Sequence, residues 1–272
     1  MKSISDQLQS FCAPGRKIIF ILLLLFFTWS LQAQEDNSFQ KSSSFQLDAG
    51  TIQIKEKNLM PKVHHGLYYG LEYGHSKQKK NFTAFHIGLG LSRLKTAYEV
   101  LSPSANVQIH GDFLYLFEMI KKTHFTYHLG PGAGLNYDAS YFPNWDESHL
   151  YWVSNLALGI RNKFNYQVND RQSLVVDLGC SLFSLFSRPE LDRQYKIDDI
   201  SIGGILENLH SNSQGGTINK SLFLSFQAEY QFHTGENITQ AICYAYDFNR
   251  VKSKEGFAFL ENVHKIGLKI YF

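Results

Sequence analysis

The chain has 272 residues, of which 44% are hydrophobic and 15% aromatic, with 22 Phe and 15 Tyr. Charged residues make up 18% and the formal net charge is +2, whereas an average soluble domain has about 25% charged residues. This composition excludes a disordered chain, a coiled coil and a nucleic-acid-binding module. It therefore gives no reason to expect a nucleic acid or another polyanion as a partner.

The first 33 residues have the build of an export signal. Arg16 and Lys17 precede a largely apolar run at residues 18–31, and Ala33 follows as a small residue at a plausible cleavage point. The run is shorter than the about 20 residues that a membrane-spanning helix needs. We therefore expect residues 1–33 to be a cleaved signal peptide, with an uncleaved N-terminal anchor as the alternative. After residue 33 no apolar stretch is long enough for a spanning helix, which excludes a multi-helix membrane protein.

Residues 34–43 are polar and predict a short periplasmic segment, and residues 44–272 then form one domain. In that domain apolar residues recur at every second position, as in Leu222, Leu224 and Phe226. A strand places such a set on one face, whereas a helix would scatter it around its circumference. Ten runs of this kind are present, around residues 45–54, 67–73, 85–91, 107–117, 125–137, 156–166, 174–182, 222–232, 238–248 and 266–272.

Two further features of these runs indicate a membrane barrel. Many runs are longer than the usual strand of about 5 to 6 residues and reach the about 9 to 11 residues that a tilted strand needs to cross a bilayer. The connections also alternate between long and short, as in outer-membrane barrels. In chain order they lie at residues 55–63, 75–80, 95–105, 120–123, 138–149, 168–172, 188–219, 233–237 and 250–259.

The composition of the other face decides which side of the predicted sheet faces water. In a soluble barrel the apolar set points inward, whereas in a membrane barrel it points to lipid and the other set lines the lumen. The other set here combines charged residues with many glycines, which suits a crowded, curved interior. We expect the charged side chains to pair across a plugged or nearly plugged lumen. The predicted polar network consists of Glu72, His86, His110, Asp112, His128, Arg161, Lys163, Asp177, Glu229, Asp247, Lys265 and Lys269.

The chain ends on an aromatic strand, residues 264–272, that alternates and finishes with Phe272. Together with the export signal and the period-two strands, this ending resembles the outer-membrane β-barrel proteins of Gram-negative bacteria. The resemblance implies an all-β, antiparallel up-and-down transmembrane barrel of about ten strands, with a range of 8 to 12. In that family the closing strand is read by the barrel-assembly machinery, which the resemblance implies for Ile266, Leu268, Ile270 and Phe272.

Two sets of residues are candidates for a reactive site. His86, His110 and His128 lie on the lumen side of consecutive strands, but at different heights, so we predict no shared metal site. Near residue 210 the chain faintly resembles the lipid A deacylase barrels, in which a His is followed two residues later by a Ser. Here His210 has Ser211 and Ser213 as neighbours, so the order of that motif is not kept. These three residues are a weak candidate for a catalytic group.

The sequence predicts a non-enzymatic barrel of the cell outer membrane without a cofactor. We expect it to act as a small or plugged pore, or as a structural or surface-interaction protein in contact with outer-membrane lipid. Its loops at residues 138–149 and 188–219 are the predicted surfaces for a protein partner. The alternatives are a lipid A hydrolase that uses His210 and a neighbouring Ser, and a secreted lipocalin-like carrier.

Overall fold

The computed structural model describes residues 40–56, 63–97, 103–144, 150–189, 203–204, 207, 210, 212–233, 238–252 and 258–272. The chain divides into two units, Met1–Phe39 and Gln40–Phe272. The predicted signal peptide, residues 1–33, lies outside the described residues. Among the described residues no helix is both long and apolar enough to cross a membrane.

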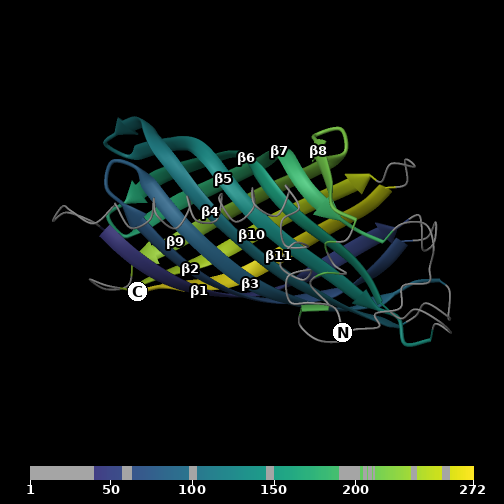
Figure 1. The fold of residues 1–272 in the computed structure, drawn as a ribbon. Coiled ribbons are helices and arrows are strands. Elements are labelled where there is room, and N and C mark those ends of the chain that lie inside the picture. The colour runs from purple at the N-terminus through teal and green to yellow at the C-terminus, as the bar shows by residue number, and fades with distance from the viewer. Residues whose placement is uncertain are drawn as a thin grey trace. The chain divides into compact units, whose positions relative to one another are not determined.

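The second unit is built from long strands (Figure 1). Those that the structure describes are β1 (Gln40–Glu56), β2 (Val63–Gln78), β3 (Phe82–Lys95), β4 (Ser104–Lys122), β5 (Phe125–Tyr141), β6 (Leu150–Asn169), β7 (Gln172–Ser187), β8 (Gln214–Thr217), β9 (Ser221–His233), β10 (Thr239–Lys252) and β11 (Ala258–Tyr271).

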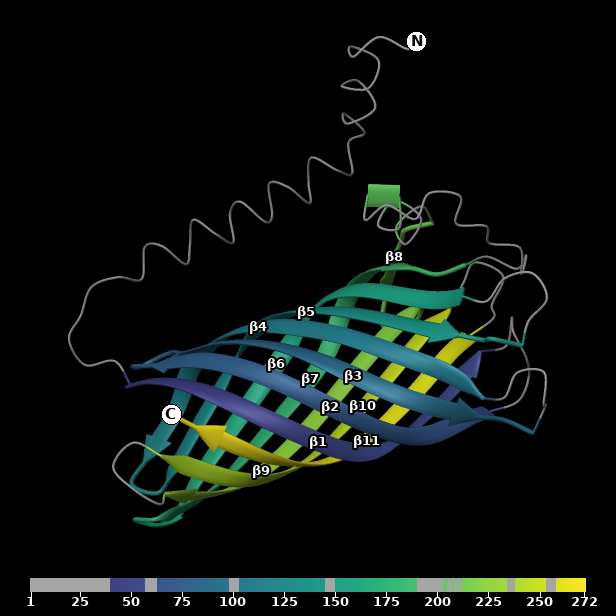
Figure 2. The same ribbon diagram turned by 90° about the horizontal axis from the view of Figure 1, so that it is seen from below.

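Ten of these strands close into an antiparallel barrel, which Figure 2 shows from a second side. β1 to β7 pair with one another in chain order. β7 then pairs with β9, β9 with β10 and β10 with β11, and β11 pairs with β1 to close the barrel. The barrel thus has no free sheet edge, and closure leaves the backbone groups of every strand paired. The predicted fold class, an antiparallel up-and-down barrel of about ten strands, is confirmed.

The short strand β8 was not predicted, because it lies within the predicted loop 188–219. β7 pairs with two strands along its length. Its residues Gln172 to Cys180 pair with β9, and its residues Phe183 to Phe186 pair with β8. A turn closed by the amide of Lys220 and the carbonyl of Thr217, 2.8 Å apart, separates the two. Four residues are too few for the periodicity of the sequence to reveal them.

The two ends of the barrel differ in the length of their connections. Connections of two or three residues join β2 to β3, β4 to β5 and β6 to β7 at one end, here called the turn end, where β9 also continues to β10 and where the C-terminus lies (Figure 1). The connections after β1, β3, β5, β7 and β10 start from the other end, here called the loop end. At the turn end the backbones of Ser43 and Phe272 exchange two hydrogen bonds of 2.8 and 2.9 Å. β1 begins at Gln40, so residues 40–43, predicted to precede the barrel, belong to it.

The outer face carries the apolar set of most strands. Leu268 and Ile266 are each 66% exposed and Leu47 is 61% exposed, while their neighbours Lys269, Lys265 and Gln46 are buried. Aliphatic and aromatic side chains of β1 to β7, β10 and β11 share this exposure. An exposed apolar surface of this extent is rare on soluble monomers, and it matches the lipid-facing band of membrane barrels.

Candidate functional site

The barrel interior contains a cavity of about 470 Å³. Its lining begins at the turn end, with Gln78, His233 and Thr239, and reaches Asn249 and Glu261 on the loop side. The side chains in between are mostly charged or polar. This cavity is the candidate site, because it is where polar groups from many strands converge.

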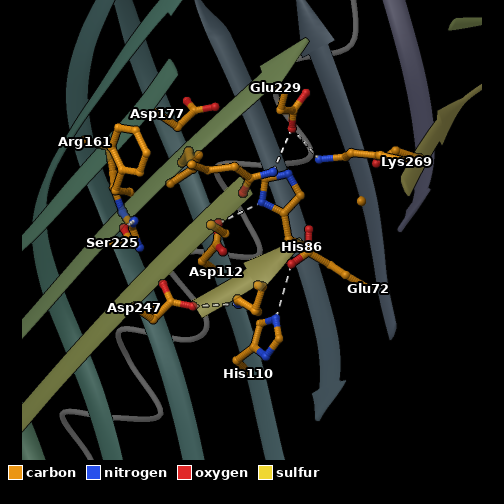
Figure 3. Close-up of a pocket in the computed structure, with 18 of the residues that line it drawn as sticks. Glu72, His86, His110, Asp112, Arg161, Asp177, Ser225, Glu229, Asp247 and Lys269 are labelled. Atoms are coloured by element: carbon orange, nitrogen blue, oxygen red, sulfur yellow. Dashed lines mark hydrogen bonds and ion pairs between the residues drawn. The ribbon is translucent and has the colours of Figure 1, made fainter. Parts of the chain in front are cut away.

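Ten of the twelve predicted lumen residues form ion pairs inside the barrel, and Figure 3 shows several of these residues. The nitrogen–oxygen distances are 2.9 Å for His86–Asp112, 3.2 Å for His110–Glu72, 3.0 Å for Lys163–Asp177, 2.6 Å for Lys265–Asp247 and 3.0 Å for Lys269–Glu229. The two histidine pairs are ionic only when the imidazole is protonated. Pairing lowers the cost of holding these groups away from bulk water.

Small residues allow ion pairs to form between strands that are not neighbours. Glu72 on β2, Gly88 on β3 and His110 on β4 lie in one register row. A Cβ atom at Gly88 would overlap the His110 imidazole. The absence of that atom lets His110 reach across β3 to Glu72. Lys269 on β11 likewise reaches across β10 to Glu229 on β9.

Glu229 accepts more hydrogen bonds than any other carboxylate in the described part of the interior. It is 2% exposed and accepts from Gln227 at 2.7 Å, Gln231 at 2.9 Å and Lys269 at 3.0 Å, as well as from the Tyr271 hydroxyl. Both carboxylate oxygens are therefore satisfied. This is the condition under which a buried charge is tolerated.

Arg161 is the lumen cation that forms no ion pair among the described residues. Its guanidinium donates a hydrogen bond to Ser225 Oγ. A Cβ atom at Gly179 would overlap the guanidinium, and one at Gly132 would crowd its alkyl chain. The glycines of β5 and β7 thus provide the space in which the long side chain of Arg161 lies along the wall.

Neither ring nitrogen of His128 has a hydrogen-bond partner among the described residues, although the side chain is only 2% exposed. Its ring lies 6.2 Å from the ring of Phe82, whereas His86 and His110 contact different carboxylates. The three histidines therefore do not converge on one point. Nowhere in the described ranges do three His, Cys, Asp or Glu side chains gather as a metal site would require.

An apolar cluster covers the loop side of the cavity. Three of its members, Tyr68, Val153 and Val263, also line the cavity. The cluster draws on β1, β2, β3, β6, β7, β10 and β11 and on the residue after β5. Its members are Ile52, Ile54, Tyr68, Leu94, Phe142, Tyr151, Val153, Phe186, Val251, Phe259 and Val263.

A buried ion pair fixes the start of the long loop to this cluster. Arg188 Nη2 lies 3.0 Å from Glu56 Oε1, with side-chain exposures of 2% and 1%. Arg188 Nη1 donates to the carbonyl of Val251 at 3.1 Å, and the Tyr151 hydroxyl donates to the other oxygen of Glu56. These groups join β1, β6, β7 and β10 at the loop end.

The predicted polar network does not include Asp138 and Glu261, two carboxyl groups that line the cavity. Gln108 Nε2 donates to both, at 2.9 Å to Asp138 and 2.7 Å to Glu261. Strand parity was the signal that could have found them, since Asp138 has the parity of Asn136 on β5 and Glu261 has that of Lys265 on β11. Arg188 had no such signal, because it follows the end of a strand.

The weak catalytic candidate does not form a nucleophile–base pair in the described residues. His210 Nε2 lies 2.7 Å from the Tyr137 hydroxyl, and Ser213 Oγ donates to the His210 carbonyl rather than to its ring. Partial burial lowers the pKa of His210. Ser211 lies outside the described residues. A serine nucleophile needs its hydroxyl at hydrogen-bond distance from the base, which Ser213 does not have.

The chain resembles known proteins in its fold and not in its sequence. No protein-family model matches the sequence, and no curated protein matches it. The outer membrane protease OmpT from Escherichia coli is similar in structure, with a TM-score of 0.56, 7% identity, and coverage of 88% of this chain and 99% of that chain. The transport unit of the autotransporter AIDA-I from Escherichia coli has a TM-score of 0.43, 7% identity, and coverage of 89% and 93%.

A third similar structure, Neisserial surface protein A, has a TM-score of 0.38 and 10% identity and covers 85% of this chain and 97% of its own. At these identities the similarity concerns the fold. The conclusion about the fold depends on the OmpT comparison alone, because the other two TM-scores are below 0.5. The chain therefore has the fold of the outer-membrane β-barrel proteins of Gram-negative bacteria.

The Glu229–Lys269 pair predicts unequal effects of removing each partner. Glu229→Gln removes the ion-pair partner of the buried Lys269 ammonium, and we expect it to cost about 3 to 5 kcal/mol of unfolding free energy. Lys269→Met leaves Glu229 with three neutral donors and should cost less than half as much. Urea unfolding of the barrel in detergent micelles, followed by tryptophan fluorescence, measures both. Equal costs would show that the three neutral donors alone do not stabilise the ionised carboxylate of Glu229.

Proposed function

We propose that the protein is an outer-membrane β-barrel with a closed lumen, which acts without catalysis as a structural or surface-interaction protein. The observation that carries the proposal is the apolar cluster, with the Glu56–Arg188 pair inside it, across the loop side of the interior. A pore for ions or polar solutes needs a continuous wet path from one end to the other. An apolar barrier in that path excludes them, because an ion in it loses its hydration.

The outer face supports a location in a membrane. Exposed Leu and Ile side chains such as Leu67, Leu89 and Leu268 stand on strands of 13 to 20 residues, which exceeds the about 9 to 11 residues needed to cross the hydrocarbon layer. The same face argues against the lipocalin-like carrier, in which the apolar set lines the interior. The likeness of the fold to outer-membrane barrels agrees with this location.

The hydrolase alternative receives no support from the described geometry. His210 contacts a tyrosine hydroxyl instead of a serine, and no ion pair among the described residues includes it. A catalytic base needs a third group that orients its ring. The loops 138–149 and 188–219 remain the proposed surfaces for a partner, although much of both lies outside the described residues.

The last strand supports the proposed role as an assembly signal. Ile266, Leu268, Ile270 and Phe272 all point outward and are 66%, 66%, 48% and 62% exposed. Their strand pairs with β1 and so closes the barrel. A strand that stays accessible until closure is a suitable element for the barrel-assembly machinery to bind.

Deletion of Phe272 tests this role. We expect at least a fivefold decrease in folded protein in the outer-membrane fraction, because the terminal aromatic side chain is lost from the binding strand. Deletion of one exposed loop residue, Ala97, is the control and should leave the level unchanged. Heat-modifiable migration on a gel measures the folded fraction. Unchanged levels after loss of Phe272 would contradict a role in assembly.

Conductance tests the closed lumen. In planar bilayers the folded protein should show no steady current, because the apolar cluster blocks the path. A variant with Phe186→Ser and Phe259→Ser should conduct if it keeps the heat-modifiable folded form, since it removes two buried rings of the cluster. A matched variant, Phe85→Ser and Ile87→Ser on the outer face, should stay silent. Large steady currents from the unaltered protein would refute the proposal.

A further inference from the structure

Two carboxyl groups in the barrel interior form no ion pair. Among the described residues that line the cavity, seven carry carboxyl groups and four are Lys or Arg. Five of these carboxyl groups belong to the lumen ion pairs described above, whereas no ion pair between described residues includes Asp138 or Glu261. Both side chains are buried. Because a buried charge needs a partner, this pair of carboxyl groups calls for a compensating ligand.

Asp138 and Glu261 approach each other from different sides of the barrel. Asp138 lies on β5, beside Gln108 of β4, whereas Glu261 lies on β11, which β3, β2 and β1 separate from β4. Gln108 Nε2 donates to Asp138 Oδ2 at 2.9 Å and to Glu261 Oε2 at 2.7 Å. The two carboxyl oxygens are thus no farther apart than the sum of these distances. One neutral amide group is all that holds the two acidic groups together.

Two carboxamide oxygens beside these carboxyl groups have no donor. Asn249 lies directly opposite Glu261 in the β10–β11 register, and both residues line the cavity. Asn249 is 3% exposed, and its Oδ1 atom has no hydrogen-bond partner among the described residues. Asn106 Nδ2 donates to Asp138 Oδ1 at 2.9 Å, while Asn106 Oδ1 is buried without a partner. Buried oxygens left without a partner cost free energy, and they point to a ligand that accepts their lone pairs.

A divalent cation satisfies both features at once. A proton shared between Asp138 and Glu261 would remove one negative charge but would leave the carboxamide oxygens without a partner. A water molecule would donate to those oxygens but would leave two carboxylates without a counter-charge. An ion of charge +2 neutralises both carboxylates and also binds the neutral oxygens.

The oxygen ligands select a hard cation, and among hard cations they suit Ca²⁺. Ca²⁺ holds carboxylate and carboxamide oxygens at about 2.3 to 2.6 Å in irregular geometry, whereas Mg²⁺ demands a near-ideal octahedron. These distances are close to those at which Gln108 Nε2 holds the two carboxyl oxygens. With two carboxylates and neutral oxygens, the site differs from the clusters of three His, Cys, Asp or Glu side chains that the described residues lack.

The cavity gives a cation a route to these oxygens. Its lining begins at the turn end, and Asp138 and Glu261 lie on its loop side, each three residues from the loop-side end of its strand. Val153 and Val263 of the apolar cluster line the same cavity. The excess of carboxyl groups along the lining attracts cations from the turn end, and the apolar cluster stops them on the loop side.

We propose that the loop side of the cavity binds one Ca²⁺ ion between Asp138 and Glu261, with Asn249 and Asn106 as neutral ligands. The bound ion links β4, β5, β10 and β11 across the lumen, next to the apolar cluster. Water in the cavity completes the six to eight oxygens that Ca²⁺ takes. This inference goes beyond the proposed function and does not depend on the membrane location or on a closed lumen.

Isothermal titration of the folded protein with Ca²⁺ in detergent micelles at neutral pH tests the proposal. We expect one bound ion per chain. The double variant Asp138→Asn and Glu261→Gln keeps the size of both side chains and should weaken binding at least tenfold. Asn249→Leu changes no charge but removes a ligand, and should weaken binding at least threefold. The matched control, Glu118→Gln and Asp170→Asn, removes two carboxylates that do not line the cavity and should keep the affinity.

Urea unfolding separates loss of binding from loss of folding. Without Ca²⁺, the double variant Asp138→Asn and Glu261→Gln should unfold at the same urea concentration as the unaltered protein or at a higher one, because the repulsion between two carboxylates is gone. Added Ca²⁺ should raise the midpoint of the unaltered protein, since it binds only the folded state. It should leave the midpoint of the double variant unchanged.

Three results would overturn the inference. The first is no Ca²⁺ binding by the unaltered protein, which would indicate that Asp138 and Glu261 share a proton instead. The second is unchanged affinity in the double variant or in Asn249→Leu, and the third is an equal loss of affinity in the control variant. The proposed function fails separately, since a protein that binds Ca²⁺ and yet conducts steady currents would contradict the closed lumen and not the cation site.

Discussion

Closure of the sheet is the constraint on which the rest of the structure depends. In a closed barrel each strand has two paired edges, and successive side chains point alternately to the two faces. Every strand must therefore divide its residues between an inside of limited width and an outside that surrounds it. Here the aliphatic residues take the outside and the charged residues the inside, and the inside is narrow enough that charges on different strands touch.

The five ion pairs of the lumen network run along the wall of the barrel, because each joins neighbouring strands or strands with one strand between them. His86 and Asp112 are direct partners in the β3–β4 register, and Lys163 and Asp177 are partners in the β6–β7 register. Other pairs extend over an intervening strand, and they require a small residue there, as at Gly88. The glycines that fill the lumen face are thus part of the electrostatic arrangement, since they clear the space through which larger charged side chains reach their partners.

The parts that the sequence could predict are those governed by period two. The alternation of residues 222–232 and 266–272 predicted both the strands and the direction of their faces, and the alternation of loop lengths predicted the two different ends. Partners on non-neighbouring strands, such as Glu229 and Lys269, could not be predicted, because their approach depends on barrel diameter and strand stagger. Strand β8 and the Arg188–Glu56 pair were also missed, since each depends on where a long loop packs and no local pattern records it.

The two faces also account for the proposed function. The inner face ends in an apolar cluster, which argues for a closed barrel, and the outer face carries exposed aliphatic side chains, which argue for a bilayer. The second argument depends on the outward direction of the apolar set. If that set faced water, the fold would have no need of a bilayer.

Spin-label accessibility in reconstituted vesicles tests this direction most directly. Single labels at Leu71, Leu89 and Leu268, in a background with Cys180→Ala and Cys243→Ala, report collision with oxygen, which concentrates in lipid, and with a water-soluble nickel chelate. The account predicts high oxygen and low nickel accessibility at all three positions, and the reverse for a label at the exposed loop residue Ala97. High nickel accessibility at Leu71, Leu89 and Leu268 would contradict the account.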